Sequence, residues 1–354
     1  MSKKHKILIL GASYGSLLGA KLLLAGHTVK LICLPAESDL INTEGIRVRM
    51  PVKARDGLVE LDSRAMPGSL SAGAPQSVDP ADYDLVALAM QEPQYSSPAV
   101  RELLQAIAIS KLPCMSIMNM PPLTYLKRVP GIDAEACRAA YTEPAVWDAF
   151  DTASMTLCSP DPQAFRPPDE KINVLQVRLP TNFKCARFES PEHTAIVRQL
   201  ESDVDAIRFG PEQLQLPVKL KLHDSVFVPL AKWAMLMAGN YRCVTAEGMR
   251  PIKEAVHSDI ETTRAMYQWV AQLCIDLGAD PADLVAFEKY ANAAMSLQSP
   301  SSAARALFGG ALNIERVDRL VQIVGRQKGR SSPVLDETVR LVDAQLERNR
   351  AAKR

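Results

Sequence analysis

The chain has 354 residues, a length that corresponds to about two domains of ordinary size. Apolar residues make up 47% of the sequence, which is enough for a substantial core and excludes a disordered chain. Because 41 Lys and Arg balance 40 Asp and Glu, the composition also excludes a strong positive field that would attract nucleic acid or an anionic membrane surface.

The cysteines and the N-terminus indicate the cellular compartment, and the cysteines and histidines indicate whether a metal site is expected. Seven cysteines are scattered without a C-x-x-C pair, and the five histidines show no metal-ligand spacing. "MSKKHK" leads directly into a short strand, whereas a signal peptide needs a longer apolar region and a small-residue cleavage site. No apolar run reaches the roughly 20 residues that span a bilayer. We therefore expect a cytoplasmic protein without a metal ion, a membrane or a nucleic acid partner.

The first part of the chain alternates predicted strands and helices. Four apolar runs predict buried strands, at residues 6–10, 28–33, 84–90 and 114–118. Two segments between them have helical spacing of apolar residues, at 14–26 and 97–108. Two further segments, 46–50 and 58–62, alternate and predict more exposed strands, and the Pro-, Ser- and Gly-rich segment 64–80 predicts a loop. This alternation predicts a parallel sheet covered by helices on both faces.

The later part of the chain changes character. Segment 151–189 combines a loop at 159–170 with strands at 172–179 and 183–189, and a helix capped by Ser190 is expected at 190–207. From about residue 218 the pattern is helical, most clearly at 225–241, 253–278 and 314–329. The change between these regions, near 208–217, predicts two domains, residues 1–212 and 213–354.

The stretch "GASYGS" at 11–16 follows the first predicted strand and opens the first helix. A dinucleotide site normally has G-x-G-x-x-G there, and Ser13 stands where the second glycine is expected. Gly11 can supply the tight turn, Gly15 and Gly19 the close packing of helix on strand, and Ser13 a hydroxyl for a phosphate oxygen. Two registers remain open, an ungapped G-x-S-x-x-S or a turn one residue shorter that ends at Gly15. The position after the first strand favours a dinucleotide site over a plain turn.

The end of the second strand commonly selects the nucleotide, because an acid there holds the ribose diol and a base accepts a 2′-phosphate. Cys33 and Leu34 occupy this position and do neither, and Glu37 lies further along. The sequence therefore leaves the choice between NADP and NAD open at this point.

Six segments of the chain resemble the ketopantoate reductase (2-dehydropantoate 2-reductase) family, and their order and spacing carry the resemblance. They are "GSLLGAKLLLAGHTVKLI", "INTEGIRV", "CMSIMN", "VPLAKWAMLMAGN", "PSSAAR" and "NIERVD". The resemblance implies a Rossmann-like doubly wound α/β sheet in residues 1–212, which would bind NADP, with NAD as the alternative. It also implies that residues 213–354 form an all-helical domain, similar to the C-terminal domain of 6-phosphogluconate dehydrogenase, for substrate binding and dimerisation.

The family's site residues can be placed on the matching positions of this chain. The resemblance assigns catalysis to two residues, Lys232 and Asn119. Candidates to bind an acidic carbonyl substrate are Asn240, Ser301, Arg305 and Asn313. Candidates to bind the cofactor are Gly11, Ala12, Ser13, Tyr14, Gly15, Ser16, Met90, Gln91 and Asn119.

Physical chemistry offers both a functional and a structural interpretation of these residues. Lys232 lies in the apolar run from Val226 to Met237, where partial desolvation of the ammonium would suit proton transfer, although a lysine can also extend from such a helix to solvent. Ser301 follows Pro300 and can equally cap a helix. Arg305 offers a fork for a carboxylate or is simply solvated. The neighbours His223 and Asp224 resemble an acid–base pair, but adjacent residues of a helix face different ways.

Departures from the family pattern argue against ketopantoate as the substrate more than they argue against the fold. Asn313 replaces a substrate-binding glutamate, unless the register slips by two and Glu315 takes that place; Leu236 replaces an asparagine, and segment 130–185 is longer than usual. We expect an NAD(P)H-dependent reductase of a 2-keto acid or related small acidic carbonyl compound. The alternatives are an opine-type dehydrogenase acting on an imine, and a non-catalytic nucleotide-binding or sensing protein of the same fold.

Overall fold

The computed structural model describes residues 3–53 and 55–353, which form two compact units. The first unit contains the residues up to Met90, Gln94–Tyr125 and Val146–Asp224. The second contains Gln91–Pro93, Leu126–Ala145 and the residues from Ser225 onward. Nucleotide binding by residues 1–212 and substrate binding and dimerisation by residues 213–354 stay predictions.

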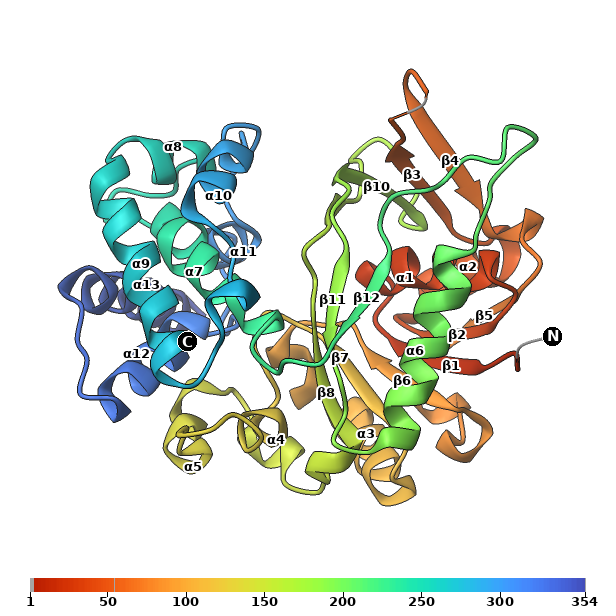
Figure 1. Cartoon of the computed structure of the whole chain (residues 1–354), viewed down its shortest axis with the longest axis horizontal. Helices are drawn as coiled ribbons and strands as arrows, with labels where there is room; N and C mark the ends of the chain where they lie inside the picture. The colour runs from red at the N-terminus through yellow and green to blue at the C-terminus, as the bar shows by residue number, and fades with distance from the viewer. Residues whose placement is uncertain (1–2, 54, 354) are drawn as a thin grey trace. The chain divides into compact units, whose positions relative to one another are not determined.

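An eight-stranded sheet forms the centre of the first unit (Figure 1). Its strands are β1 (Lys6–Leu10), β2 (Thr28–Ile32), β5 (Ser69–Gly73), β6 (Leu85–Leu88), β7 (Cys114–Ile117), β8 (Met155–Ser159), β11 (Phe183–Ala186) and β12 (Leu220–His223). Their order is β12-β11-β8-β7-β6-β1-β2-β5. The six strands from β5 to β8 are parallel and have the 3-2-1-4-5-6 order of dinucleotide-binding sheets. The order reverses between β1 and β6, where such sheets bind ligands.

Helices cover both faces of this sheet. From β1 the chain moves to β2 through α1 (Tyr14–Leu24), and from β6 it moves the opposite way to β7 through α3 (Pro98–Ser110). Right-handed crossovers therefore put α1 and α3 on opposite faces. Because β11 is antiparallel to β8, the crossover from β11 to β12 through α6 (Pro191–Asp205) returns to the α1 face, and α6 contacts α1.

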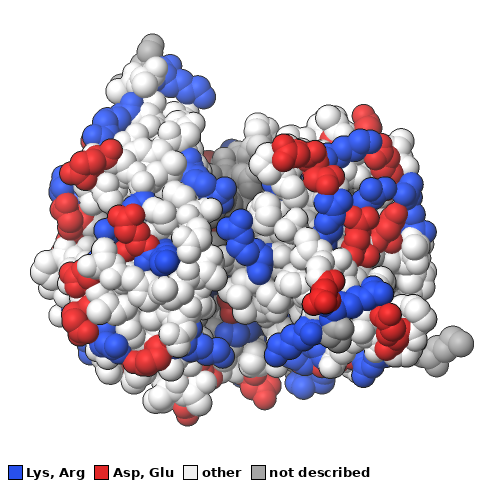
Figure 2. Space-filling view, turned by 90° about the horizontal axis from the view of Figure 1, so that it is seen from above, with Lys and Arg blue, Asp and Glu red and all other residues white. Residues whose placement is uncertain are grey.

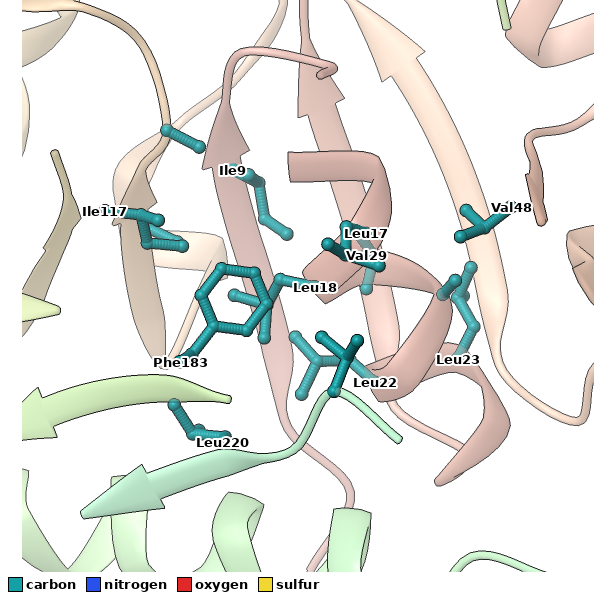
Figure 3. Packing of buried hydrophobic residues seen from close by; sticks show 14 of the residues in the cluster. Ile9, Leu17, Leu18, Leu22, Leu23, Val29, Val48, Ile117, Phe183 and Leu220 are labelled. Atoms are coloured by element: carbon teal, nitrogen blue, oxygen red, sulfur yellow. The ribbon is translucent and has the colours of Figure 1, made fainter. Parts of the chain in front are cut away.

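A second sheet packs on the other side of α1. It consists of β3 (Arg47–Pro51), β4 (Leu58–Asp62), β9 (Gln163–Phe165) and β10 (Val174–Leu179), in the order β4-β3-β10-β9. Its inward side chains, such as Val48, join the same hydrophobic core as α1. Figure 3 shows Val48 near Leu23 of α1, while Leu18 and Leu22 approach Phe183. Every residue of α1 from Gly15 to Leu23 is consequently buried, Lys21 included.

The second unit is predominantly helical. Its main helices are α5 (Ala134–Cys137), α7 (Lys232–Met235), α8 (Ile252–His257), α9 (Ile260–Asp276), α10 (Phe287–Ala294), α11 (Ser302–Phe308), α12 (Val317–Gln327) and α13 (Pro333–Ala352). Among the helices in residues 3–53 and 55–353, none combines the length and the apolar character needed to cross a bilayer. Basic and acidic side chains are interspersed over the face shown in Figure 2, as the balanced composition suggests.

Most predicted elements are confirmed, and the exceptions have physical causes. The predicted loop 64–80 is wrong at β5, whose small and polar residues "SLSAG" form a strand because the exposed edge of β2 is available for pairing. The predicted loop 159–170 is wrong at β9, which pairs with β10. The prediction of helix from residue 218 is wrong at β12, a short strand next to β11. The predicted helix 253–278 is two helices, since Asp259 caps the start of α9.

Among the elements that the sequence did not predict, two lie near the candidate site. β8 adds the sixth parallel strand, and α2 (Pro35–Glu44) follows β2. α2 begins with Pro35 at its first position and has few apolar residues, so its periodicity is weak. Both elements matter for the site, because their ends lie at or next to the carboxyl edge of the sheet.

Candidate functional site

Gly11 makes a tight turn at the edge of the sheet. It follows β1 with a φ of 102°, and its N–H donates to the carbonyl of Ile32 at 2.8 Å. A β-carbon at Gly11 would lie 2.6 Å from the carbonyl oxygen of Ala89 and 2.7 Å from Cγ of Met90. Only glycine permits both this conformation and this approach between the ends of β1 and β6. The turn follows the first strand, as the sequence predicted, and it lies at the point where the strand order reverses.

Gly15 provides the close packing of α1 on the sheet. A β-carbon there would lie 2.8 Å from Cγ2 of Ile9, whereas one at Gly19 would make an ordinary 3.5 Å contact with Val29. Of the two registers left open by the sequence, this geometry favours the shorter turn that ends at Gly15. The start of an eleven-residue helix directed at the turn supplies N–H groups without intrahelical partners, which suit an anion.

The two serines of the turn differ in their availability. Ser16 is 3% exposed, and its hydroxyl donates to the carbonyl of Ala12 at 2.6 Å, so this side chain is committed to the turn itself. Ser13 is half-buried and precedes the first helical residue, Tyr14. Within this turn, Ser13 is thus the better placed hydroxyl for a phosphate; cofactor binding by residues 11–16 stays a prediction.

Two further candidates share this edge of the sheet. Met90 lies two residues beyond the end of β6, and Asn119 lies two residues beyond the end of β7; both are half-buried. The N–H of Met90 donates to the hydroxyl of Tyr95 at 3.0 Å. Because β1, β6 and β7 are parallel neighbours, the structure brings Gly11, Met90 and Asn119 to one edge. Gln91 is exposed and belongs to the second unit.

The end of β2 carries an ion pair between Glu37, which the sequence analysis considered, and Arg166, which it missed. Leu34 occupies the position that commonly selects the nucleotide, and its apolar side chain is 73% exposed. Glu37, in the first turn of α2, has a side chain only 8% exposed and forms an ion pair with Arg166. Burial raises the pKa of Glu37, and Arg166 opposes that shift. Burial, together with the charge of Glu37, raises the pKa of the Cys33 thiol to about 12.

Arg166 reaches this position on a segment that crosses the carboxyl edge of the sheet. We call residues 160–166 the crossing segment; it leaves β8 after Ser159 and contains β9, which Arg166 follows directly. On its way, the carbonyl of Pro162 accepts a hydrogen bond from the hydroxyl of Tyr14 at 2.9 Å. The sheet positions of β8 and β2 differ by four strand spacings, about 19 Å, and seven extended residues span about 23 Å. No sequence signal marks a contact across 129 positions.

Lys232 and Asn240 flank an irregular helix in the second unit. Lys232 is half-buried at the start of α7, and Asn240 is half-buried at the end of a π-helical turn, Leu236–Asn240. The regular α-helix predicted over 225–241 is therefore wrong at this turn. π-turns occur frequently at functional sites, because they redirect side chains that an α-helix would space evenly. The catalytic role of Lys232 stays a prediction.

Ser301 has a structural role in the second unit. It is 2% exposed, donates its hydroxyl hydrogen to the carbonyl of Asn240 at 2.7 Å and accepts the N–H of Ala304 at 3.1 Å, as the N-cap of α11. A hydroxyl has a single hydrogen to donate. A substrate carboxylate would have to displace the Asn240 carbonyl to receive it, so the hydrogen bonds support the capping interpretation.

The remaining substrate candidates differ in burial. Arg305 is exposed on α11, and Asn313 is exposed and accepts a hydrogen bond from Nη2 of Arg350 at 3.0 Å. Glu315 is only 7% exposed, and its carboxylate accepts the N–H of Glu92 at 3.3 Å. Glu315, rather than Asn313, is therefore the inward-facing residue of this stretch, which agrees with the register shifted by two.

Other residue groups examined for chemistry are structural. His223 ends β12 and Asp224 follows it exposed, so the helix assumed for this pair is wrong. Asp318 is fully buried and accepts two hydrogen bonds of 2.9 Å from Arg316, which ties the start of α12 in place. Within residues 3–53 and 55–353, no group of three or more His, Cys, Asp and Glu could hold a metal ion.

Known structures with this arrangement are reductases and a dehydrogenase. The 2-dehydropantoate 2-reductase from Methylococcus capsulatus superposes with a TM-score of 0.65 at 13% identity, over 97% of each chain. D-Mandelate dehydrogenase, solved with NADH and anilino(oxo)acetate, gives 0.63 at 15% identity, over 98% of this chain and 99% of that one. A ketopantoate reductase from Ralstonia eutropha JMP134 gives 0.59 at 16%, with the same coverage. Neither a protein-family model nor a curated protein matches the sequence. The predicted resemblance is confirmed: the chain has the ketopantoate reductase fold, with a Rossmann-like sheet and a helical C-terminal region.

Proposed function

We propose that the protein is an NAD(P)H-dependent oxidoreductase that reduces the carbonyl of a 2-keto acid or a related small acidic compound. The observation that carries this proposal is the glycine contact at the switch point of the sheet, where a β-carbon on Gly11 would lie 2.6 Å from the carbonyl of Ala89. Such a turn leads directly into α1 at the switch point, where the first N–H groups of a helix bind a ligand's phosphates in sheets of this order. The fold shared with reductases and a dehydrogenase supports the same class of reaction.

The residues at this edge fit a dinucleotide. Gly11 makes the turn and Gly15 lets α1 pack closely on the sheet, the first N–H groups of α1 would bind the pyrophosphate, and Ser13 would add a hydroxyl. Met90 and Asn119, at the ends of the next two strands, would flank the nicotinamide. A bound reduced nicotinamide supplies a hydride to the carbonyl carbon.

The protein's own part is to position the substrate and deliver a proton. In this proposal Lys232 donates the proton to the developing alkoxide, and Asn240, from the same irregular helix, orients the carbonyl compound. Glu315 is a better candidate than Asn313 for a polar contact with the substrate, because Glu315 is buried and Asn313 is bonded to Arg350 at the surface. The family likeness further suggests a cytoplasmic homodimer acting on a small molecule.

A second candidate function is a non-catalytic nucleotide-binding or sensing protein. It is favoured by the residues expected to bind substrate, since Ser301 is committed to capping and both Arg305 and Asn313 are exposed. Nucleotide binding without turnover of any carbonyl or imine substrate would establish this function instead.

Two measurements test the proposal. Melting temperatures are compared with and without NADPH, NADP+, NADH and NAD+, because a ligand that binds only the folded state must raise the melting temperature. Oxidation of the reduced nucleotide is then followed across a panel of 2-keto acids and imines, where turnover of imines alone would identify an opine-type dehydrogenase. A chain that no nucleotide stabilises is not an oxidoreductase of this type.

The role of Lys232 is tested by substitution. Lys232→Ala removes the proposed proton donor, and we expect kcat to fall about 100-fold or more, with the affinity for nucleotide unchanged. The matched control is Lys289→Ala, which removes an exposed lysine from α10 of the same unit. If both variants keep the wild-type kcat, Lys232 is not the proton donor.

A further inference from the structure

We propose that Arg166, brought to the end of β2 by the crossing segment, recognises the 2′-phosphate of NADP(H) and makes this chain selective for it. The inference rests on the proposed function and names the residue that determines which nucleotide is bound. It concerns a residue outside every segment that resembles the ketopantoate reductases.

The position of Arg166 is the first argument. In sheets of this order the adenosine ribose lies beyond the end of the second strand, β2, next to the glycine turn. Arg166 is fixed to that place by its ion pair with Glu37, three residues after Leu34. The crossing segment also touches the glycine turn itself, through the 2.9 Å hydrogen bond from Tyr14 to Pro162. Arg166 itself is therefore held at the end of β2, and the crossing segment that carries it is held at the glycine turn after β1. The ribose would lie between these two places.

The different exposure of Glu37 and Arg166 determines whether a ligand would contact the carboxylate or the guanidinium. The Glu37 side chain is 8% exposed, whereas that of Arg166 is 31% exposed. The carboxylate therefore faces the protein and holds one side of the guanidinium, while other N–H groups of the guanidinium remain toward solvent. A planar guanidinium with several N–H donors matches a phosphate bidentately. A ribose diol without phosphate would need the carboxylate, which is engaged by Arg166.

The segment around Arg166 is held rigidly enough to preorganise the group. Arg166 follows β9 directly, and β9 is paired with β10 through Phe165 and Gln176. Arg178, on β10, stacks over the ring of Phe165 with its guanidinium carbon 4.9 Å from the ring centroid. At the other end, the carboxylate of Asp161 forms a 3.0 Å ion pair with Lys184. Holding the segment in place reduces the conformational entropy that nucleotide binding must overcome.

The experiment measures dissociation constants rather than turnover. NADPH, NADH, adenosine 2′,5′-bisphosphate and adenosine 5′-monophosphate are titrated into the wild type, Arg166→Leu and Arg166→Lys by calorimetry. The wild type should bind NADPH and the bisphosphate more tightly than their partners without the 2′-phosphate. Arg166→Leu should weaken both at least tenfold and leave NADH within about twofold, and Arg166→Lys should retain an intermediate preference. Arg55→Leu, an exposed arginine of the same unit that also pairs with a glutamate, Glu212, is the matched control and should change neither ratio.

The outcomes separate this inference from the proposed function. If the wild type binds nucleotides but prefers NADH, or if both Arg166 variants keep the wild-type ratio of NADPH to NADH affinity, Arg166 does not select the nucleotide and the proposed function stands. If the wild type binds none of the four compounds, both are overturned. Melting temperatures of the variants establish that they are folded, and Arg166→Lys provides the answer where Arg166→Leu does not fold.

Discussion

The ends of β1 and β2 are neighbours in the sheet, but they are built in different ways. The end of β1 is made by residues adjacent in sequence, with Gly11 turning the chain and Gly15 packing the helix that follows. The end of β2 is completed by Arg166, which comes from 129 positions away. The first therefore depends on backbone conformation, and the second depends on a long-range contact between side chains.

This difference teaches which parts of such a site can vary independently. A turn defined by glycines tolerates almost no side chain, because the ends of β1 and β6 leave no space for one. A nucleotide-selecting group only has to be held near the ribose, and any segment that passes there can carry it. The crossing segment passes over the sheet edge and takes this role in our proposal.

The largest expected effect is that of Gly11→Ala. The new β-carbon would lie 2.6 Å from the carbonyl of Ala89, at a φ of 102° that alanine rarely adopts. We expect the free energy of unfolding to fall by about 3 kcal/mol and nucleotide binding to be lost. Urea denaturation and the nucleotide-dependent melting temperature measure the two effects.

Gly19→Ala is the matched control on the same helix. There the added methyl makes only an ordinary contact, 3.5 Å from Cγ1 of Val29, and alanine favours a helix over glycine by about 1 kcal/mol. This variant should be as stable as the wild type or slightly more stable. Equal losses in both variants would show that the turn is not special and that the contrast between the two strand ends is unfounded.

The second prediction concerns Lys21 on α1, the helix that connects β1 to β2. Its side chain is 2% exposed between the sheets and donates to the carbonyl of Pro217. Burial, with a smaller contribution from Lys219, lowers its pKa from 10.5 to about 7. Below pH 7 the ammonium is buried at a cost, and between pH 7 and 10.5 the unfolded chain binds more protons than the folded one.

Lys21→Met should therefore raise the free energy of unfolding at pH 6, by about 2 kcal/mol after the loss of one hydrogen bond. The advantage over the wild type should shrink as the pH rises from 7 toward 10.5. Lys53→Met, at an exposed position of the same unit, is the control and should show no such trend. A variant less stable than the wild type at every pH would mean that the bond to Pro217 outweighs the burial of charge.

The same contrast explains how much of the fold and of the candidate site can be predicted from the sequence. The four central parallel strands β1, β2, β6 and β7, the helix α1 and the glycine turn were predictable because apolar periodicity and glycine spacing are local signals. β5 was missed because "SLSAG" has no such signal and is a strand only through its pairing with β2. In the second unit, the sequence left Ser301 open between a substrate contact and a helix cap, and it could not choose between Asn313 and Glu315, since burial depends on the packing of distant segments.

The smallest expected effect is that of Tyr14→Phe. This substitution tests the contact between the glycine turn after β1 and the crossing segment that carries Arg166 to the end of β2. The substitution keeps the ring next to α1 and removes only the hydroxyl that donates to the Pro162 carbonyl. We expect a loss of about 1 kcal/mol in the free energy of unfolding and faster proteolysis within the crossing segment. Because Arg166 is also held by Glu37, the preference for NADPH over NADH should decrease only modestly. Complete loss of that preference would mean that the hydrogen bond from Tyr14, and not the ion pair, positions Arg166.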